Sequence, residues 1–199
     1  MPDLLQSFMN GEVKFPNGVD NDQAKTTIAE IQSQADEFFG LRSAGGSRSQ
    51  NFLENIIRPT LNGLGLGGSA AEELLLGTAI QESSLTHRTQ LGGGPGLGLF
   101  QMEPATHNDI WNNYLKYRPD LGKQVSSLLT STDKLGNLQN NDAYATAMAR
   151  VHYLRARGAL PSAGDLSGQA SYWKSNYNTS LGKGTTSQYV NNWNLVRGN

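Results

Sequence analysis

The chain has 199 residues, a net charge of −1 and no cysteine. This length is enough for one domain with a buried core, and the near balance of charge argues against a dedicated nucleic-acid-binding protein. Disulfides, thiolate nucleophiles and cysteine-ligated metals are excluded. No apolar run is long enough to cross a bilayer, and the first residues lack the pattern of an ordinary secretory signal, so we expect neither feature.

Apolar residues recur at helical spacing in segment after segment, beginning in the N-terminal part. One stripe runs through residues 24–38 and a second through residues 52–61, and glycines then interrupt the pattern at residues 63–68. We therefore predict an N-terminal helical arm over residues 1–65, followed by a compact helical domain over residues 66–199.

Further helices are predicted along the second part of the chain. Ser69 and Glu72 have the spacing of a capping box, which marks a helix start, and Pro104 suits the first position of another helix. No convincing alternating strand occurs, so the predicted fold class is mainly α, with at most one short hairpin. The later apolar stripes lie at residues 110–115, 144–154, 166–177 and 189–196.

Glu82 stands out because it ends an otherwise apolar helical segment, residues 74–85. It shares a helix face with Ala79 and Leu75, which lie one and two turns before it. Burial beside apolar side chains favours the neutral acid and raises its pKa, which is the setting that a general acid needs near neutral pH. The alternative interpretation is a glutamate that faces solvent at a helix end.

A glycine-rich segment, GGGPGLGLFQMEPAT at residues 92–106, follows this helix. Its glycines let the backbone approach a neighbour closely. A phosphate-binding loop is excluded here, because no strand precedes the glycines and no Gly-Lys-Ser/Thr sequence follows them. The second candidate for such a loop also fails, since Lys183 is followed by Gly184.

Three motifs in order resemble the soluble-type (SLT) lytic transglycosylases of the lysozyme-like superfamily. They are Glu82 with Ser83, the turn at residues 98–101, and the Pro-Ala-Thr sequence at residues 104–106. In that family a Glu-Ser pair ends a helix, a Gly-Leu-Met-Gln-type turn follows, and Pro-x-Thr opens the next helix. The resemblance covers residues 65–195 and implies a lysozyme-like helical fold.

The family also carries a Tyr-Asn pair that lines the cleft, and Tyr177 with Asn178 is the matching candidate. The small residues that usually flank this pair are missing here, so Tyr172 or Tyr153 are alternatives for the same role. The C-terminal part of the chain resembles phage-encoded members of the family more than cellular ones.

The resemblance implies cleavage of the β-1,4 bond between N-acetylmuramic acid and N-acetylglucosamine in peptidoglycan. Glu82 would protonate the leaving oxygen and then take a proton from the C6 hydroxyl, which gives a 1,6-anhydro end without consuming water. The N-acetyl group of the substrate would stabilise the developing positive charge. No metal or cofactor is implied. The substrate-binding candidates are Ser83, Phe100, Gln101, Met102, Tyr177 and Asn178.

Each of these candidates has a functional and a structural interpretation. Ser83 would hold the rotamer of Glu82 or simply finish the helix. The amide of Gln101 suits an N-acetyl or hydroxyl group, or else it stabilises the turn. Tyr177 would bond Glu82 or the N-acetyl group, unless it is a core tyrosine with a satisfied hydroxyl. Phe100 and Met102, together with Leu99, would contact sugar faces or pack under the turn.

A second carboxylate near Glu82 would favour a hydrolytic, lysozyme-type mechanism instead. Glu103 is interpreted as an acid at a helix N-terminus and Asp109 as a surface residue. The three histidines show no metal-ligand spacing, and the three tryptophans lie on apolar stripes and are predicted to be core residues.

Peptidoglycan lies outside the cytoplasm, so the enzyme would act in a phage virion or in the host periplasm and cell wall. Delivery would come from a phage particle, a holin-dependent route or a dedicated secretion machine. The predicted arm, residues 1–65, is a candidate for binding other virion proteins. A further alternative is a non-catalytic virion structural or wall-binding module on the same fold.

Overall fold

The computed structural model describes residues 46–178 and 182–197. The chain divides into two compact units, Met1–Ser43 and Ala44–Asn199, and the described residues all belong to the second. The helical stripe predicted at residues 24–38 lies outside the described residues.

The part of the chain that the structure describes is built from helices and contains no β-strand, which confirms the prediction of a mainly α protein. None of its helices combines the length and the apolar character that crossing a bilayer requires. The helical elements are residues 46–52, η1 (Leu53–Ile57), α3 (Arg58–Gly63), α4 (Ser69–Ser83), α5 (Pro104–Asn113), η2 (Leu115–Tyr117), α6 (Pro119–Ser126), α7 (Lys134–Asn140), α8 (Asp142–Leu154), α9 (Leu166–Trp173), η3 (Lys174–Asn178) and α10 (Thr186–Arg197).

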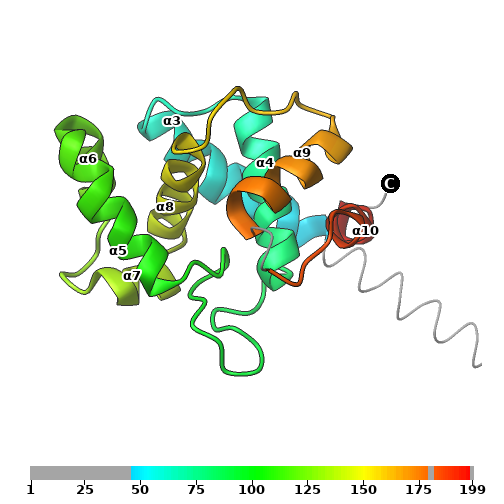
Figure 1. The fold of residues 1–199 in the computed structure, drawn as a ribbon, viewed down its shortest axis with the longest axis horizontal. Coiled ribbons are helices and arrows are strands. Elements are labelled where there is room, and N and C mark those ends of the chain that lie inside the picture. The colour runs from blue at the N-terminus through cyan, green and yellow to red at the C-terminus, as the bar shows by residue number, and fades with distance from the viewer. Residues whose placement is uncertain (1–45, 179–181, 198–199) are drawn as a thin grey trace, which may run out of the picture. The chain divides into compact units, whose positions relative to one another are not determined.

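Helix α4 is the core helix of this unit. Every residue from Leu74 to Ile80 is buried, and a helix that is apolar on all sides must be covered on all sides. Helices α8, α9 and α10 pack against it, and Figure 1 shows it between α8 on one side and α9 and α10 on the other. The end of α4, where Glu82 lies, is therefore held by several neighbours.

The predicted capping box at the start of α4 is wrong. The helix begins at Ser69 itself, its N-cap position is Gly68, and no side chain caps it. Glu72 instead accepts a hydrogen bond of 3.0 Å from the Arg58 guanidinium. The Glu72 carboxylate is therefore bound in an ion pair with Arg58 and does not cap the start of its own helix.

The helix before α4 packs into the same core. Ile57 and Leu61 are fully buried, and η1 and α3 contact α4 or α8. This burial is the physical reason why the compact unit begins at Ala44, whereas we predicted the arm to continue to residue 65.

Helix α8 also carries the second group of helices, α5, α6 and α7 (Figure 1). A buried polar cluster joins α5 to α8: Trp111 Nε1 donates to the Tyr144 hydroxyl over 2.9 Å, and that hydroxyl lies 2.8 Å from His107 Nε2. Burial lowers the pKa of His107, which favours its neutral ring. Nδ1 lies 3.2 Å from Asn108 Oδ1, an acceptor, so Nδ1 donates there and Nε2 accepts the hydrogen bond from the Tyr144 hydroxyl. His107 is therefore a structural residue of this cluster.

Candidate functional site around Glu82

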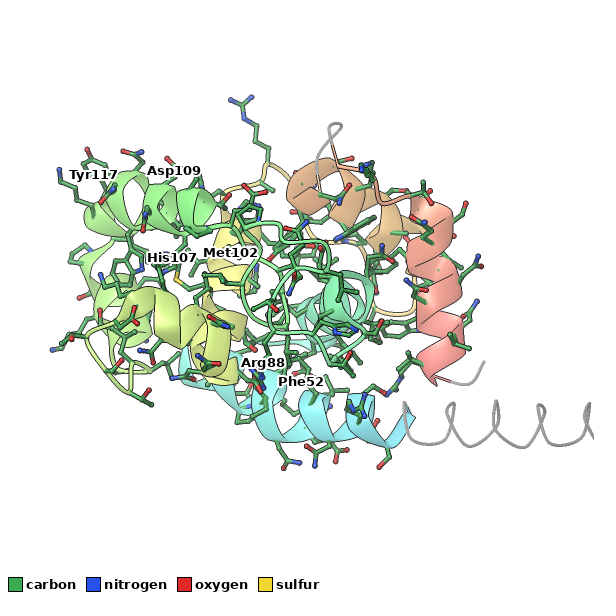
Figure 2. All side chains as sticks on the ribbon, turned by 90° about the horizontal axis from the view of Figure 1, so that it is seen from below. Phe52, Arg88, Met102, His107, Asp109 and Tyr117 are labelled. Carbon is green, nitrogen blue, oxygen red and sulfur yellow. The ribbon has the colours of Figure 1, made fainter. Side chains whose placement is uncertain are left out.

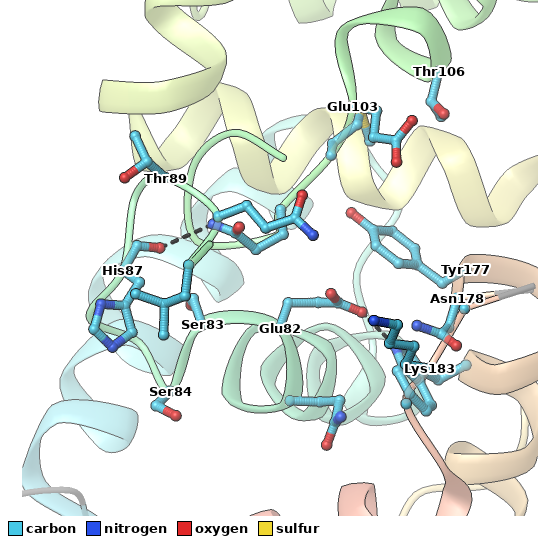
Figure 3. Close-up of a pocket in the computed structure, with 18 of the residues that line it drawn as sticks. Glu82, Ser83, Ser84, His87, Thr89, Glu103, Thr106, Tyr177, Asn178 and Lys183 are labelled. Carbon is cyan, nitrogen blue, oxygen red and sulfur yellow. Dashed lines mark hydrogen bonds between the residues drawn. The ribbon is translucent and has the colours of Figure 1, made fainter. Parts of the chain in front are cut away.

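A pocket of about 820 Å³ lies beside the C-terminal end of α4. Its walls come from the end of α4 with the loop after it, the turn before α5, and the region of η3 and the loop before α10 (Figure 3). Most of its lining side chains are polar: Gln81, Glu82, Ser83, Ser84, His87, Thr89, Gln90, Gln101, Glu103, Thr106, His152, Asn178 and Lys183. This lining suits a ligand that is rich in hydroxyl and amide groups.

Glu82 projects from the last turn of α4 into this pocket (Figure 3). Its Oε1 accepts a hydrogen bond of 2.8 Å from Trp173 Nε1. Burial raises the pKa of Glu82 from 4.5 to about 7, and the hydrogen bond from Trp173 opposes this rise. A carboxyl with this pKa can both donate and accept a proton near neutral pH, as general acid–base chemistry requires.

The end of α4 is shaped by two residues in the left-handed conformation, Ser84 and Leu85, with φ of 52° and 56°. Ser83 Oγ lies 2.9 Å from the Ala79 carbonyl and 2.7 Å from the Leu99 carbonyl, and it donates its proton to this pair. Ser83 lines the pocket, but its hydroxyl bonds backbone carbonyls rather than the carboxyl of Glu82. It ties the C-terminal end of α4 to the turn before α5.

That turn is built on Gly98, which has a φ of 69° and whose added Cβ would overlap the Leu138 carbonyl. Gln101, at a φ of 45°, donates from Nε2 to the Gly98 carbonyl over 2.7 Å and to the His87 carbonyl over 3.1 Å. Its amide nitrogen therefore stabilises the turn, while the residue also lines the pocket. Leu97 makes two isolated bridges here, the only pairing of this kind among the described residues.

Phe100 and Met102 lie on either side of Gln101 and are both buried. Phe100 packs against Phe52 with ring centroids 6.1 Å apart and does not line the pocket. Met102 is buried as well but does line the pocket. The sugar contact predicted for Phe100 is therefore wrong, because its side chain belongs to the core.

Tyr177 lines the pocket from η3, and its hydroxyl donates to the Phe100 carbonyl over 2.9 Å. The hydroxyl proton of Tyr177 is therefore donated to the backbone, whereas we predicted a hydrogen bond from Tyr177 to Glu82 or to an N-acetyl group. Of the two alternatives, Tyr153 bonds Thr78 in the core at 2.8 Å, and neither it nor Tyr172 lines the pocket. The side chain of the neighbouring pocket residue, Asn178, accepts a 2.7 Å hydrogen bond from Lys174.

The residue that contacts Glu82 most directly, Trp173, was predicted only as a core side chain. It is fully buried, and its indole nitrogen also binds the carboxyl. The one available signal was its place one helical turn before Tyr177 on the same stripe. His152 and Lys183 also line the pocket, and no local pattern in the sequence marked them.

Of the two further carboxylates, Glu103 is exposed and lines the pocket, and Figure 3 shows its carboxyl directed toward the pocket. Asp109 lies at the surface on α5 (Figure 2), where it pairs with Arg155. Within residues 46–178 and 182–197, no group of three His, Cys, Asp or Glu side chains could hold a metal ion.

Comparison of the chain with protein-family models, with curated proteins and with solved structures finds no match. The chemistry of the site therefore has to be inferred from its own groups. These are a partly buried carboxyl with a pKa near 7, a fixed donor on one of its oxygens, and a polar pocket in front of it.

Proposed function

We propose that the protein is a peptidoglycan lytic transglycosylase on a lysozyme-like helical domain, with Glu82 as its single acid–base residue. The observation that carries this proposal is the carboxyl of Glu82, partly buried in the pocket wall with a pKa raised to about 7. Such a site is typical of acid–base residues, since exposed glutamates are ionised at neutral pH. The motifs shared with the SLT-type enzymes point to the same residue.

In the proposed reaction, neutral Glu82 donates its proton to the glycosidic oxygen while the bond from that oxygen to the anomeric carbon breaks. The N-acetyl group of the substrate stabilises the positive charge at that carbon. The carboxylate of Glu82 then removes the proton of the C6 hydroxyl, whose oxygen bonds to the anomeric carbon. Glu82 ends neutral, and no water is consumed. A pKa near the working pH suits both proton transfers.

The polar lining supports an oligosaccharide as the substrate class. Amide and hydroxyl groups of Gln81, Thr89, Gln90 and Asn178 line the pocket around the acid. These neutral groups can exchange donors and acceptors with sugar hydroxyls without the cost of burying a charge.

The proposal is tested by incubating the protein with purified peptidoglycan and measuring the masses of the soluble fragments. A transglycosylase gives fragments whose muramic acid ends are lighter than hydrolysed ends by one water molecule. Intact glycan strands after exhaustive incubation, with the protein bound to the wall, would instead indicate the non-catalytic wall-binding module.

Hydrolysis by a muramidase on the same fold is the second candidate, and the position of Glu103 on the pocket wall favours it. A second carboxylate can activate a water molecule on the face of the sugar opposite the acid. In that case the fragments carry reducing ends, and the variant Glu103→Gln loses most of its turnover. Under the transglycosylase mechanism the same variant still produces anhydro ends.

We also propose that the protein acts on the bacterial wall as part of a phage particle or during host lysis. The resemblance of its C-terminal part to phage-encoded enzymes supports this. Within the predicted arm, residues 1–43 lie outside the unit that begins at Ala44 and are the candidate segment for binding virion proteins. Mass spectrometry of purified particles tests the virion assignment: the protein is recovered in them if it is a virion component and absent if it serves lysis alone.

A further inference from the structure

The contact between Trp173 and Glu82 joins two elements that are far apart in sequence. Trp173 ends α9 and Glu82 lies in the last turn of α4, and the indole Nε1 donates to Oε1 of the carboxyl over 2.8 Å. Trp173 is fully buried, so bulk water cannot reach its N–H without moving the ring, whereas Glu82 is partly exposed to the pocket.

The indole ring is held from two sides. Tyr189 of α10 packs against it with ring centroids 5.4 Å apart. On another side lies Gly184, where an added Cβ would come within 2.6 Å of Trp173 Cη2. Gly77 of α4 in turn leaves room for the hydroxyl of Tyr189, which an added Cβ would overlap. Two glycines and one aromatic ring thus fix the direction of the indole N–H.

An indole nitrogen donates a hydrogen bond and cannot accept one. Oε1 of Glu82 must therefore be the acceptor in both protonation states of the carboxyl. In the neutral acid, the better acceptor is the oxygen without the proton, so the proton lies on Oε2.

We propose that Trp173 is a positioning residue that fixes the acidic proton of Glu82 on Oε2 and stabilises the carboxylate left after proton transfer. This inference rests on the proposed function, in which Glu82 is the acid, and it identifies which oxygen delivers the proton. Trp173 acts through Glu82 and needs no contact with the sugar.

The hydrogen bond from Trp173 favours the ionised carboxyl, whereas burial favours the neutral acid. Removing the donor while keeping the apolar ring should therefore raise the pKa of Glu82 further. The other titratable or charged groups that line the pocket or interact with Glu82 stay in place in such a variant: His87, Glu103, His152, Tyr153, Tyr177 and Lys183.

The variant Trp173→Phe makes this change, and the titration is followed in the free protein by ¹³C NMR of the Glu side-chain carboxyls, with Glu82→Gln for the assignment. We expect the pKa of Glu82 to rise above its value of about 7 in the parent. An unchanged value would mean that Trp173 only shields the carboxyl from water. A fall toward 4.5 would mean that it only fills space. Either result overturns the inference.

A second measurement needs no change at Trp173. The chain has three tryptophans, and the indole ¹H–¹⁵N resonance of the one bonded to Glu82 should titrate with the carboxyl in the parent and become independent of pH in Glu82→Gln. Three indole resonances that ignore this titration would overturn the inference even if Trp173→Phe fails to fold.

Turnover of peptidoglycan gives the functional readout. Trp173→Phe should lower kcat by about tenfold to a hundredfold, the range for a hydrogen bond to a charged group, and leave KM unchanged. The matched control is Tyr189→Phe, which alters the same aromatic cluster but keeps the indole donor. We expect the pKa of Glu82 in this control to equal its value in the parent. If the parent cleaves no glycan yet both titrations behave as expected, the proposed function fails and the coupling stands. If the parent cleaves glycan and the titrations do not move, the coupling fails alone.

Discussion

Replacing Glu82 by glutamine should stabilise the protein at alkaline pH although it removes the proposed acid. The folded-state pKa of Glu82 is about 7 and its ordinary value is 4.5, so the folded protein binds the proton more tightly than the unfolded chain does. The free energy of unfolding that this tighter proton binding contributes is fully present below pH 4.5. It is lost as the pH rises to 7 and beyond, where the folded protein releases the proton. This pKa difference corresponds to about 3 kcal/mol of lost stability at pH 8.

The measurement is the free energy of unfolding of the parent and of Glu82→Gln, by urea denaturation at pH 4 and at pH 8. We expect the variant to gain about 3 kcal/mol on the parent between these two pH values, because the amide has no charge to bury. In thermal unfolding this corresponds to a relative gain in Tm of roughly 6 to 12 °C for a domain of this size.

The matched control is Glu103→Gln, which changes a carboxyl lining the same pocket but exposed to solvent. Exposed substitutions usually alter stability by less than about 0.5 kcal/mol, so this variant should follow the parent at both pH values. An equal difference between parent and Glu82→Gln at pH 4 and pH 8 would refute the burial argument for Glu82.

Three further predictions follow from the same geometry. The pH profile of glycan cleavage should fall on its alkaline side near pH 7, where Glu82 loses its proton; constant activity up to pH 9 would contradict this. Tyr177→Phe should cost about 1–3 kcal/mol in urea denaturation, because the buried Phe100 carbonyl loses its donor; parent-like stability would contradict it. Gly98→Ala should lower stability by at least about 1 kcal/mol, because the left-handed turn against Leu138 has no room for a Cβ; a neutral effect would show that the turn can relax.

The sequence is informative where the decisive interactions are local. Leu75 and Ala79 share a helix face with Glu82, and this spacing predicts that the carboxyl lies at the buried end of α4. The glycines before Pro104 likewise indicate a tight turn that leads into a helix. These features need only neighbouring residues for their explanation.

The sequence is uninformative where the partner lies far along the chain. No local pattern reveals that Trp173 donates to Glu82, that the Tyr177 hydroxyl bonds the Phe100 carbonyl, or that Glu72 pairs with Arg58. Each of these contacts depends on how the helices pack. The predicted capping box does not form, because Glu72 pairs with Arg58 of a neighbouring helix instead.

The boundary of the domain shows the same limit. A stripe of apolar residues at positions 52–61 predicts a helix, but it does not say which surface the helix covers. Burial of Ile57 and Leu61 against the core helices decides that this segment belongs to the unit that begins at Ala44.

Solubilisation of purified peptidoglycan sacculi by the parent and by Glu82→Gln, at equal concentrations of folded protein, tests the proposed role of the acid most directly. We expect the parent to release soluble glycan fragments and the folded variant to release none above the background without protein. Equal rates of release by the two proteins would show that another group donates the proton and that the assignment of Glu82 is wrong.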